Sequence, residues 1–259
     1  MKFFTKSIKA VLAAGVLAAG FGMATASAEI RLGLDSSPYP PFADEKNGVR
    51  SGFEIELGEA ICKAMNETCV WTPIAWDGII PALNSNKIDA IFASMSITEK
   101  RMKVIAFSDK YYNTPAALVA PKSATIDGSP ASVKGKIVGV QVSTTHADYA
   151  KKYFSDSAAE LKTYQAFDEH NNDLVAGRVD AVVGDSLAFD AFLKSDAGSK
   201  FEIKAFLKDE AVFGKGVGVG LRKDSPLLEK FNAAIKKVRE DGTYDAIAKK
   251  YFNFDIYGG

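Results

Sequence analysis

Several hydroxyl groups and an arginine follow a short, largely apolar stretch in the first half of the chain. Residues Ile88–Phe92 fit a buried strand, and Ser94 and Ser96 follow it directly. Thr98 is of a residue type that begins helices, which places Arg101 in the first turn of the helix it caps. Hydroxyls, free backbone N–H groups and a guanidinium group at a helix start can together bind a small carboxylate. This stretch is therefore a candidate carboxylate site.

The same pattern recurs in the second half of the chain. Residues Val179–Asp185 match Ile88–Ser94 position for position and end in a carboxylate instead of a hydroxyl. The strands expected at Glu29–Asp35 and Lys136–Gln141 also end in polar side chains. Ligands of α/β sheets bind beyond the carboxyl ends of parallel strands. The repeat therefore predicts two related α/β lobes, with mostly parallel sheets, that face each other across an amino acid.

Residues 1–28 have the features of a signal peptide. A positively charged start is followed by the apolar stretch Ala10–Met23 and by the small residues Ala26-Ser27-Ala28 at a cleavage site. The apolar stretch is too short and too rich in Ala and Gly for a stable membrane span. We therefore expect a soluble, periplasmic mature chain that begins at Glu29.

Composition and cysteine usage narrow the class of protein. Basic and acidic residues number 32 each, and three of the lysines leave with the signal peptide, so no basic patch for nucleic acid is expected. The remaining length suits two domains of about 100 residues each in a monomer. Cys62 and Cys69 are an even pair in an exported chain and predict a disulfide. A two-ligand metal site is the weaker alternative, because no His lies near them.

Further elements follow from spacing. Phe53–Met65 has helical spacing, and Asp77 is expected to cap the next helix, with Trp76 just outside it. The Gly-rich stretch Phe213–Leu221 lacks the Gly-Lys-Ser/Thr ending of a phosphate loop and favours a strand where the chain crosses between lobes. Residues Pro226–Tyr251 predict a helix that an Asp-Gly pair interrupts and that packs on one lobe.

The order and spacing of these motifs resemble one known family. The matching segments are Tyr39-Pro-Pro-Phe42, Gly52-Phe-Glu-Ile-Glu-Leu57, Trp76-Asp-Gly-Ile-Ile-Pro81, Ser96-Ile-Thr-Glu-Lys-Arg101, Gly135-Lys-Ile-Val-Gly-Val140, Asp241-Gly-Thr-Tyr244 and Lys250-Tyr-Phe252, with the Cys62–Cys69 spacing. Across residues 29–259 the chain resembles the polar amino-acid-binding receptors of bacterial ABC importers. Among these it is most similar to the lysine/arginine/ornithine- and histidine-binding proteins.

The resemblance implies the type II periplasmic-binding-protein fold, an α/β fold whose two lobes are joined by two crossing hinge strands. It implies a first lobe at residues 29–113 and 218–259, hinges at 114–118 and 213–217, and a second lobe at 119–212. In this family the lobes close on the ligand about the hinge, and the receptor delivers it to an inner-membrane permease. The implied function is capture of an L-amino acid, with arginine, lysine or ornithine favoured over histidine.

The resemblance also implies roles for single residues. Arg101 falls on the family's position for the ligand α-carboxylate, and Thr145 would add donors to the same group. Asp185 falls on the position that pairs with the α-ammonium group. Asp35 matches the acid that receives the end of a basic side chain.

Other positions of the family would surround the rest of the ligand. Tyr39 and Trp76 would hold an extended side chain between two aromatic rings. Ser94 and Ser96 would contact the ammonium and carboxylate groups. The further candidates are Gln141, Ser143 and His146.

The chain departs from the family's pattern, and each residue has a purely structural alternative. Three residues separate Asp35 from Tyr39 where the family has two, and Ser143 stands where close relatives have Gly. Arg101 could lie on a solvated helix face and Asp185 could cap a helix. Asp35 could cap a turn, and a solvated helix position is favoured for His146.

Three other functions share the fold. An opine or glutamine receptor would keep the carboxylate site, although the acid at Asp185 argues against an opine. An exported enzyme similar to cyclohexadienyl dehydratase would need a carboxylate in the cleft that is free to move protons. A sensor module would need an attached membrane or signalling domain. Each expected cleft acid has a cation to hold, so we expect no catalytic residue, no cofactor and no metal.

Overall fold

The computed structural model describes residues 1–2 and 29–258. The predicted signal peptide therefore lies almost wholly outside the described residues. No helix within residues 29–258 is long and apolar enough to cross a membrane.

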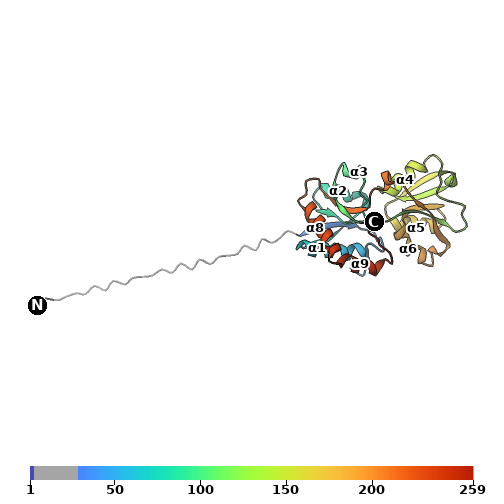
Figure 1. Ribbon diagram of the computed structural model, residues 1–259. Coiled ribbons are helices and arrows are strands. Elements are labelled where there is room, and N and C mark those ends of the chain that lie inside the picture. The colour runs from blue at the N-terminus through green and yellow to red at the C-terminus, as the bar shows by residue number, and fades with distance from the viewer. Residues whose placement is uncertain (3–28, 259) are drawn as a thin grey trace.

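The strand–helix repeat forms two sheets, one in each of two lobes that lie side by side (Figure 1). The first sheet has, in spatial order, β4 (Cys69–Ile74), β1 (Ile30–Asp35), β5 (Ala90–Ile91), β12 (Val217–Leu221) and β6 (Ala106–Tyr112). The second has β11 (Phe201–Leu207), β7 (Ala116–Pro121), β10 (Ala181–Asp185), β8 (Ile137–Gln141) and β9 (Glu160–Tyr164). A small hairpin, β2 (Asp44–Lys46) and β3 (Val49–Ser51), extends from the first lobe.

Helices cover both sheets. The first lobe carries α1 (Phe53–Met65), α2 (Ile79–Asn84), α3 (Glu99–Met102), α8 (Leu227–Glu240) and α9 (Thr243–Tyr251). The second carries α4 (Thr145–Tyr153), α5 (Phe167–Val175), α6 (Ser186–Lys194) and α7 (Glu210–Phe213). Short 3-10 turns are η1 (Trp76–Gly78), η2 (Pro130–Val133) and η3 (Gly198–Lys200). The predicted helical tail is thus α8 and α9, interrupted at Asp241-Gly242 and packed on the first lobe.

The expectation of mostly parallel sheets is confirmed for the direction of the strands, although one strand in each sheet runs the other way and makes both sheets mixed. In the first sheet β4, β1 and β5 pair in parallel, whereas β12 is antiparallel to both of its neighbours. In the second, β9, β8 and β10 pair in parallel, and β7 is antiparallel to both of its neighbours. The reason is topological: β12 and β7 each enter their sheet from the other lobe, so they run away from the cleft while the other strands run towards it.

The chain passes between the lobes at residues 113–115 and 214–216. The first passage joins β6 to β7, and the second joins α7 to β12. The predicted hinges at 114–118 and 213–217 overlap these passages, although β7 and β12 already begin within them. Their action as hinges stays a prediction.

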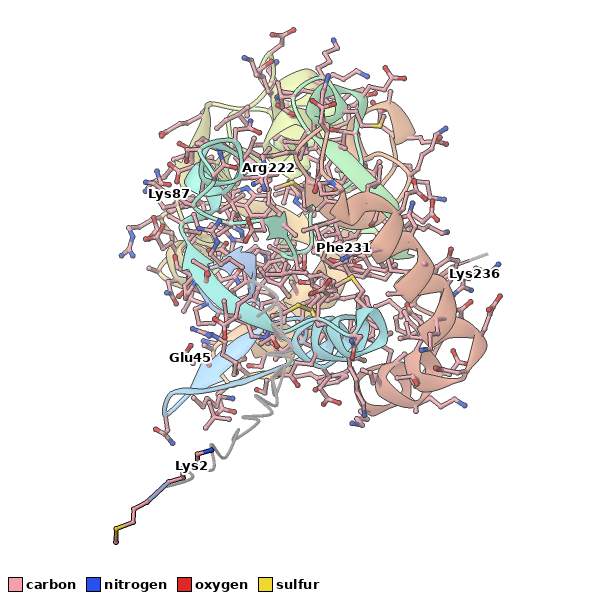
Figure 2. The ribbon with its side chains drawn as sticks, turned by 90° about the vertical axis from the view of Figure 1, so that its left-hand side faces the viewer. Lys2, Glu45, Lys87, Arg222, Phe231 and Lys236 are labelled. Atoms are coloured by element: carbon pink, nitrogen blue, oxygen red, sulfur yellow. A yellow bond between two sulfur atoms is a disulfide. The ribbon has the colours of Figure 1, made fainter. Side chains whose placement is uncertain are left out.

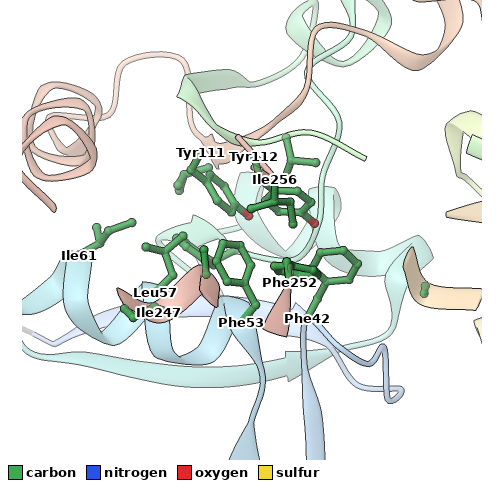
Figure 3. Packing of buried hydrophobic residues seen from close by; sticks show 14 of the residues in the cluster. Phe42, Phe53, Leu57, Ile61, Tyr111, Tyr112, Ile247, Phe252 and Ile256 are labelled. Carbon is green, nitrogen blue, oxygen red and sulfur yellow. The ribbon is translucent and has the colours of Figure 1, made fainter. Parts of the chain in front are cut away.

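An aromatic core holds the first lobe together. Phe42, Phe53 and Phe252 pack beneath Tyr111 and Tyr112 (Figure 3), with the Phe42 and Tyr112 rings stacked 5.0 Å apart. On α8, Phe231 points into this lobe, whereas Lys236 points into solvent (Figure 2). Burial of several large aromatic side chains gives a rigid frame for the strand ends that face the second lobe.

The start of α1 departs from the usual capping pattern. Gly52 has φ 127°, and a Cβ there would lie 2.3 Å from the carbonyl oxygen of Phe42. This close approach lets the carbonyls of Pro41 and Phe42 accept the N–H groups of Phe53 and Glu54. Backbone therefore does the work of a capping side chain, and the first turn of α1 is fixed against the Tyr39–Phe42 turn.

The prediction that Asp77 caps a helix is wrong. Residues Trp76–Gly78 form the 3-10 turn η1, closed by the Gly78 N–H to the Ala75 carbonyl at 2.9 Å. The chain therefore already curls before α2 begins, and no side chain caps α2. Trp76 consequently lies within the turn instead of just outside the helix.

Cys62 and Cys69 form the predicted disulfide, which ties α1 to β4. Closing a loop of this size contributes about 2.5 kcal/mol by chain entropy. We therefore expect the double variant Cys62→Ala/Cys69→Ala to lose about 2.5 kcal/mol of unfolding free energy. Urea denaturation measures this, with reduced wild-type protein as the control, which should match the variant. Equal stability of oxidised wild type and variant would show that the bond does not stabilise the fold.

Candidate functional site

A cavity lies between the two lobes at the carboxyl ends of β1, β5, β8 and β10. It encloses about 810 Å³ of space, including its opening, which is in the range of small-molecule sites. The predicted residues that line it are Asp35, Tyr39, Trp76, Ser94, Ser96, Arg101, Gln141, Thr145, His146 and Asp185. Ser143 is the one candidate whose side chain does not line it. Residues from strand ends far apart in sequence are thus brought to one place.

Arg101 is held in the cavity by local structure of its own lobe. Thr98 begins α3, and its hydroxyl accepts the Arg101 backbone N–H at 3.2 Å, as the sequence predicts. The guanidinium group donates to the carbonyl of Ser96 at 3.0 Å, and its carbon lies 5.5 Å from the centre of the Trp76 ring. Arg101 is only 9% exposed, so the alternative of a solvated helix face is wrong.

The charge of Arg101 is not neutralised by a nearby acid. Its guanidinium group has no carboxylate at ion-pair distance within residues 29–258, and both bonded acceptors are backbone carbonyls. Burial lowers the pKa of Arg101 to about 10, and the charge of Asp148 acts in the opposite direction. The group stays cationic at neutral pH, so the cavity contains a buried positive charge with hydrogen-bond donors to spare.

Ser143 contributes through its backbone. Its side chain is exposed, whereas its carbonyl crosses the cleft to accept from Arg101 Nη2 at 3.2 Å. The residue has φ 60°, in the left-handed region that favours Gly. The backbone of Ser143 therefore has a conformation that Gly adopts readily.

Asp185 ends β10 and binds groups from outside its own lobe. Its carboxylate accepts from the hydroxyl of Thr114, in the first passage between the lobes, at 2.6 Å, and from the hydroxyl of Tyr39 at 3.0 Å. It is 5% exposed, and burial raises its pKa to about 6, although both hydrogen bonds lower it. Asp185 occupies the residue position before α6, but its side chain does not cap that helix, so the capping alternative is wrong.

Tyr39 and Asp35 both reach the cavity despite the extra residue between them. The Asp35 carboxylate accepts the N–H of Ser37 at 3.0 Å, so it does cap the turn, and this tight turn takes up the added length. Its other oxygen accepts from Gln141 Nε2 at 3.3 Å, across the cleft. Burial raises the pKa of Asp35, and the nearby acids Asp168 and Asp77 add to the rise.

Tyr39 is held in place by contacts with the second lobe. Its hydroxyl bonds Asp185, and its ring contacts Phe167 of the second lobe edge-on, 5.0 Å between centres. Trp76 also lines the cavity, beside Arg101. The two aromatic residues therefore line one cavity, and Tyr39 also joins the lobes.

Glu54 is a cavity residue that the sequence analysis missed. It is 2% exposed and accepts from the backbone N–H of Ser94 at 2.8 Å, from the Ser94 hydroxyl at 2.9 Å and from the Tyr111 hydroxyl. Burial raises its pKa to about 7. These bonds stabilise Ser94 in a left-handed conformation with φ 52°. The missed signal was its helical spacing to Leu57, Gly58 and Ile61, which puts Glu54 on the buried face of α1.

The start of α4 lies on the second-lobe side of the cavity. Thr144 caps this helix by accepting the Ala147 N–H at 3.0 Å, which leaves the N–H groups of Thr145 and His146 at the helix start. His146 is half-buried beside Phe213 and lines the cavity, so its predicted solvated position is wrong. Burial, with a contribution from the charge of Arg101, lowers the pKa of His146 to about 3. The imidazole is therefore neutral at physiological pH.

The cavity has charges for a small polar ligand and no arrangement for a metal. Among the described residues, no group of three or more His, Cys, Asp or Glu side chains is placed to hold a metal ion. The lobes contact each other around the cavity, and an exposed ion pair between Lys100 and Asp148 at 2.7 Å joins them at its edge. The cavity thus places a cation, Arg101, and an acid, Asp185, where they could bind the two charged groups of a small zwitterion.

Comparison with known proteins agrees with this geometry. The model of the bacterial extracellular solute-binding proteins, family 3, matches residues 30–254. The chain belongs to this family. It is 44% identical to the L-arginine-binding protein of Pseudomonas aeruginosa over 88% of this chain and 90% of that protein. It is 42% identical to the histidine-binding periplasmic protein of Salmonella typhimurium over the full length of both.

Structural similarity confirms the type II periplasmic-binding-protein fold. An ancestral arginine-binding protein bound to arginine superposes with a TM-score of 0.80, at 38% identity, over 87% of this chain and 98% of that one. The family of amino-acid-binding proteins that the sequence motifs resemble is therefore confirmed. The cavity described above lies where the two lobes of this fold meet.

The raised pKa of Asp185 has a consequence for stability. A carboxyl group whose folded pKa lies above its unfolded value stabilises the fold below the unfolded pKa and loses that contribution as pH rises through the folded pKa. Between pH 4 and 7.5, Asp185 should therefore remove about 2–3 kcal/mol from the unfolding free energy of the ligand-free protein. Asp185→Asn should not show this loss.

Urea denaturation at several pH values tests this, with the exposed Asp190→Asn on α6 as the matched control. As pH rises, the unfolding free energy of wild type should fall relative to that of Asp185→Asn. A difference that is independent of pH would show that Asp185 is not destabilised by burial.

Proposed function

We propose that this protein is a periplasmic receptor that encloses an L-amino acid with a cationic side chain and delivers it to an ABC importer. The observation that supports this most is the charge pattern of the cavity. Arg101 is a buried cation, Asp185 a buried acid and Asp35 a half-buried acid, and all three line the cavity without ion-pair partners among residues 29–258. Glu54, the other acid in the lining, already accepts from Ser94 and Tyr111 through its two oxygens. An amino acid with a basic side chain has the complementary set of one negative and two positive groups.

The α-carboxylate is assigned to Arg101 and the start of α4. The guanidinium group can donate two parallel hydrogen bonds to a carboxylate. The start of α4 adds backbone N–H groups and the hydroxyl of Thr145. A charge-assisted pair that is buried and hydrogen-bonded in this way contributes more to the binding free energy than it would at the surface. Neutral His146 beside this point does not compete for the carboxylate as a second cation.

The α-ammonium group is assigned to Asp185, with Ser94 beside it. The Ser94 hydroxyl donates its proton to Glu54, so its oxygen lone pairs are left to accept from an ammonium group. Tyr39 and Thr114 hold the Asp185 carboxylate in place. The side chain of the ligand would then extend between Tyr39 and Trp76 towards Asp35.

Binding is favoured over catalysis. Glu54 has the raised pKa expected of a proton-transfer group, but both of its oxygens are bonded to protein donors. A carboxyl group held in this way positions Ser94 and is not free to move protons. The basic ligand is favoured over glutamine or an opine, because a neutral or anionic side-chain end would face Asp35.

Export and hinge motion would allow the receptor to deliver its ligand. Cleavage after Ala28 would release a monomeric mature chain into the periplasm. Hinge motion at 114–118 and 213–217 would open and close the cavity, and an inner-membrane permease would receive the ligand. The names of the arginine- and histidine-binding relatives support a ligand in this class.

The central experiment is calorimetric titration of the mature chain, stripped of ligand by unfolding and refolding. Arginine, lysine, ornithine, histidine, glutamine, glutamate and octopine are compared. Submicromolar binding confined to cationic amino acids is expected, about −8 kcal/mol or beyond. Tight binding of glutamine or octopine with no response to arginine would contradict the assignment of the side-chain end. No binding to any of them would contradict the receptor proposal.

Arg101→Ala should weaken binding of the preferred ligand by about 2–5 kcal/mol, because the carboxylate would lose its paired donors inside a dry cavity. Titration measures the loss, and thermal unfolding checks the fold. The matched control is Lys103→Ala, which removes an exposed cation next to the same helix. Wild-type affinity in Arg101→Ala would remove Arg101 from the site.

A further inference from the structure

Gln141 connects the two lobes at the side-chain end of the cavity. It ends β8, as Asp35 ends β1, and it is 6% exposed. Its Nε2 donates to the Asp35 carboxylate at 3.3 Å and to the backbone carbonyl of Gln165 at 3.0 Å. The amide therefore spans the cleft between the ends of two equivalent strands.

These two bonds determine which atom of Gln141 a ligand can use. A carboxamide nitrogen carries two hydrogens, and both are taken by acceptors of the protein. The carboxamide oxygen receives no hydrogen bond from the described part of the chain, and Gln141 lines the cavity. The fixed amide plane thus offers the ligand an acceptor and no donor.

The surroundings of Gln141 add acceptors and negative charge. One oxygen of Asp35 accepts the Ser37 N–H and the other accepts from Gln141, which leaves lone pairs on both. Asp77 and Asp168 lie close enough to act electrostatically on Asp35. This end of the cavity, defined here as Asp35 and Gln141, is therefore rich in acceptors, while the donor of Gln141 is used within the protein.

We infer that Gln141 makes this end of the cavity selective for a guanidinium group over an ammonium group. The inference rests on the proposed function and narrows it to arginine among the cationic amino acids. A guanidinium group is planar and carries five N–H donors in fixed directions, so it can reach the Asp35 carboxylate and the Gln141 oxygen together. An ammonium group is a compact point charge that gains mainly from Asp35. A urea or amide end would place its own carbonyl oxygen against acceptors.

The test compares ligands and variants in one titration series. Wild type, Gln141→Met and Gln165→Leu are titrated with arginine, lysine, ornithine and citrulline. Methionine keeps the length and bulk of glutamine without the amide. Gln165→Leu is the matched control, because the Gln165 side chain is exposed and only its backbone carbonyl contacts Gln141. Thermal unfolding confirms that each variant is folded.

Wild type should bind arginine at least tenfold more tightly than lysine or ornithine, and citrulline more weakly still. Gln141→Met should lower arginine affinity about tenfold while lysine changes less than threefold, and Gln165→Leu should leave the ratio unchanged. Equal losses for arginine and lysine in Gln141→Met, or a wild type that prefers lysine, would overturn the inference and leave the receptor function intact. If no cationic amino acid binds wild type, the proposed function itself fails.

Discussion

Arg101, Asp185 and Glu54 lie between the lobes, largely removed from water, and none of them forms an ion pair within residues 29–258. Placing charges in such surroundings is unfavourable, which is why burial shifts the pKa of each towards the neutral form. Hydrogen bonds from hydroxyls and to carbonyls reduce the cost without removing the charge. A zwitterion, the class of ligand proposed above, would supply both opposite charges at once and complete the site.

The passages between the lobes are attached to the cavity. In the second passage, the Gly216 carbonyl accepts the Ile97 N–H at 2.8 Å, beside the loop that carries Ser96. In the first, Thr114 bonds Asp185, and the Pro115 carbonyl accepts the Ser186 N–H at 2.9 Å. The same segments that would bend on opening therefore contact residues assigned to the ligand. If the lobes close on a ligand as proposed, these short hydrogen-bonded paths link closure to binding.

Much of the site could be predicted from the sequence where local rules apply. The Thr98 cap sets the place of Arg101, helical spacing gives the bounds of α1, and the internal repeat pairs Ser94 with Asp185 at equivalent strand ends. The errors also have local causes. Asp77 failed as a cap because the backbone had already formed a 3-10 turn, and Glu54 was missed although its helical spacing placed it on the buried face.

The sequence by itself determined the elements, the two-lobe repeat, the cysteine pair and the residue types at the strand ends, because caps, periodicity and spacing act over a few residues. Only the tertiary structure decided which of these residues meet. Tyr39 and Asp185 are 146 residues apart and Asp35 and Gln141 are 106 apart, yet each pair is bonded across the cleft. Such partners are chosen by how the two lobes pack against each other. No local pattern encodes that choice. Nor does one encode the burial that raises the pKa of Asp185 and Glu54.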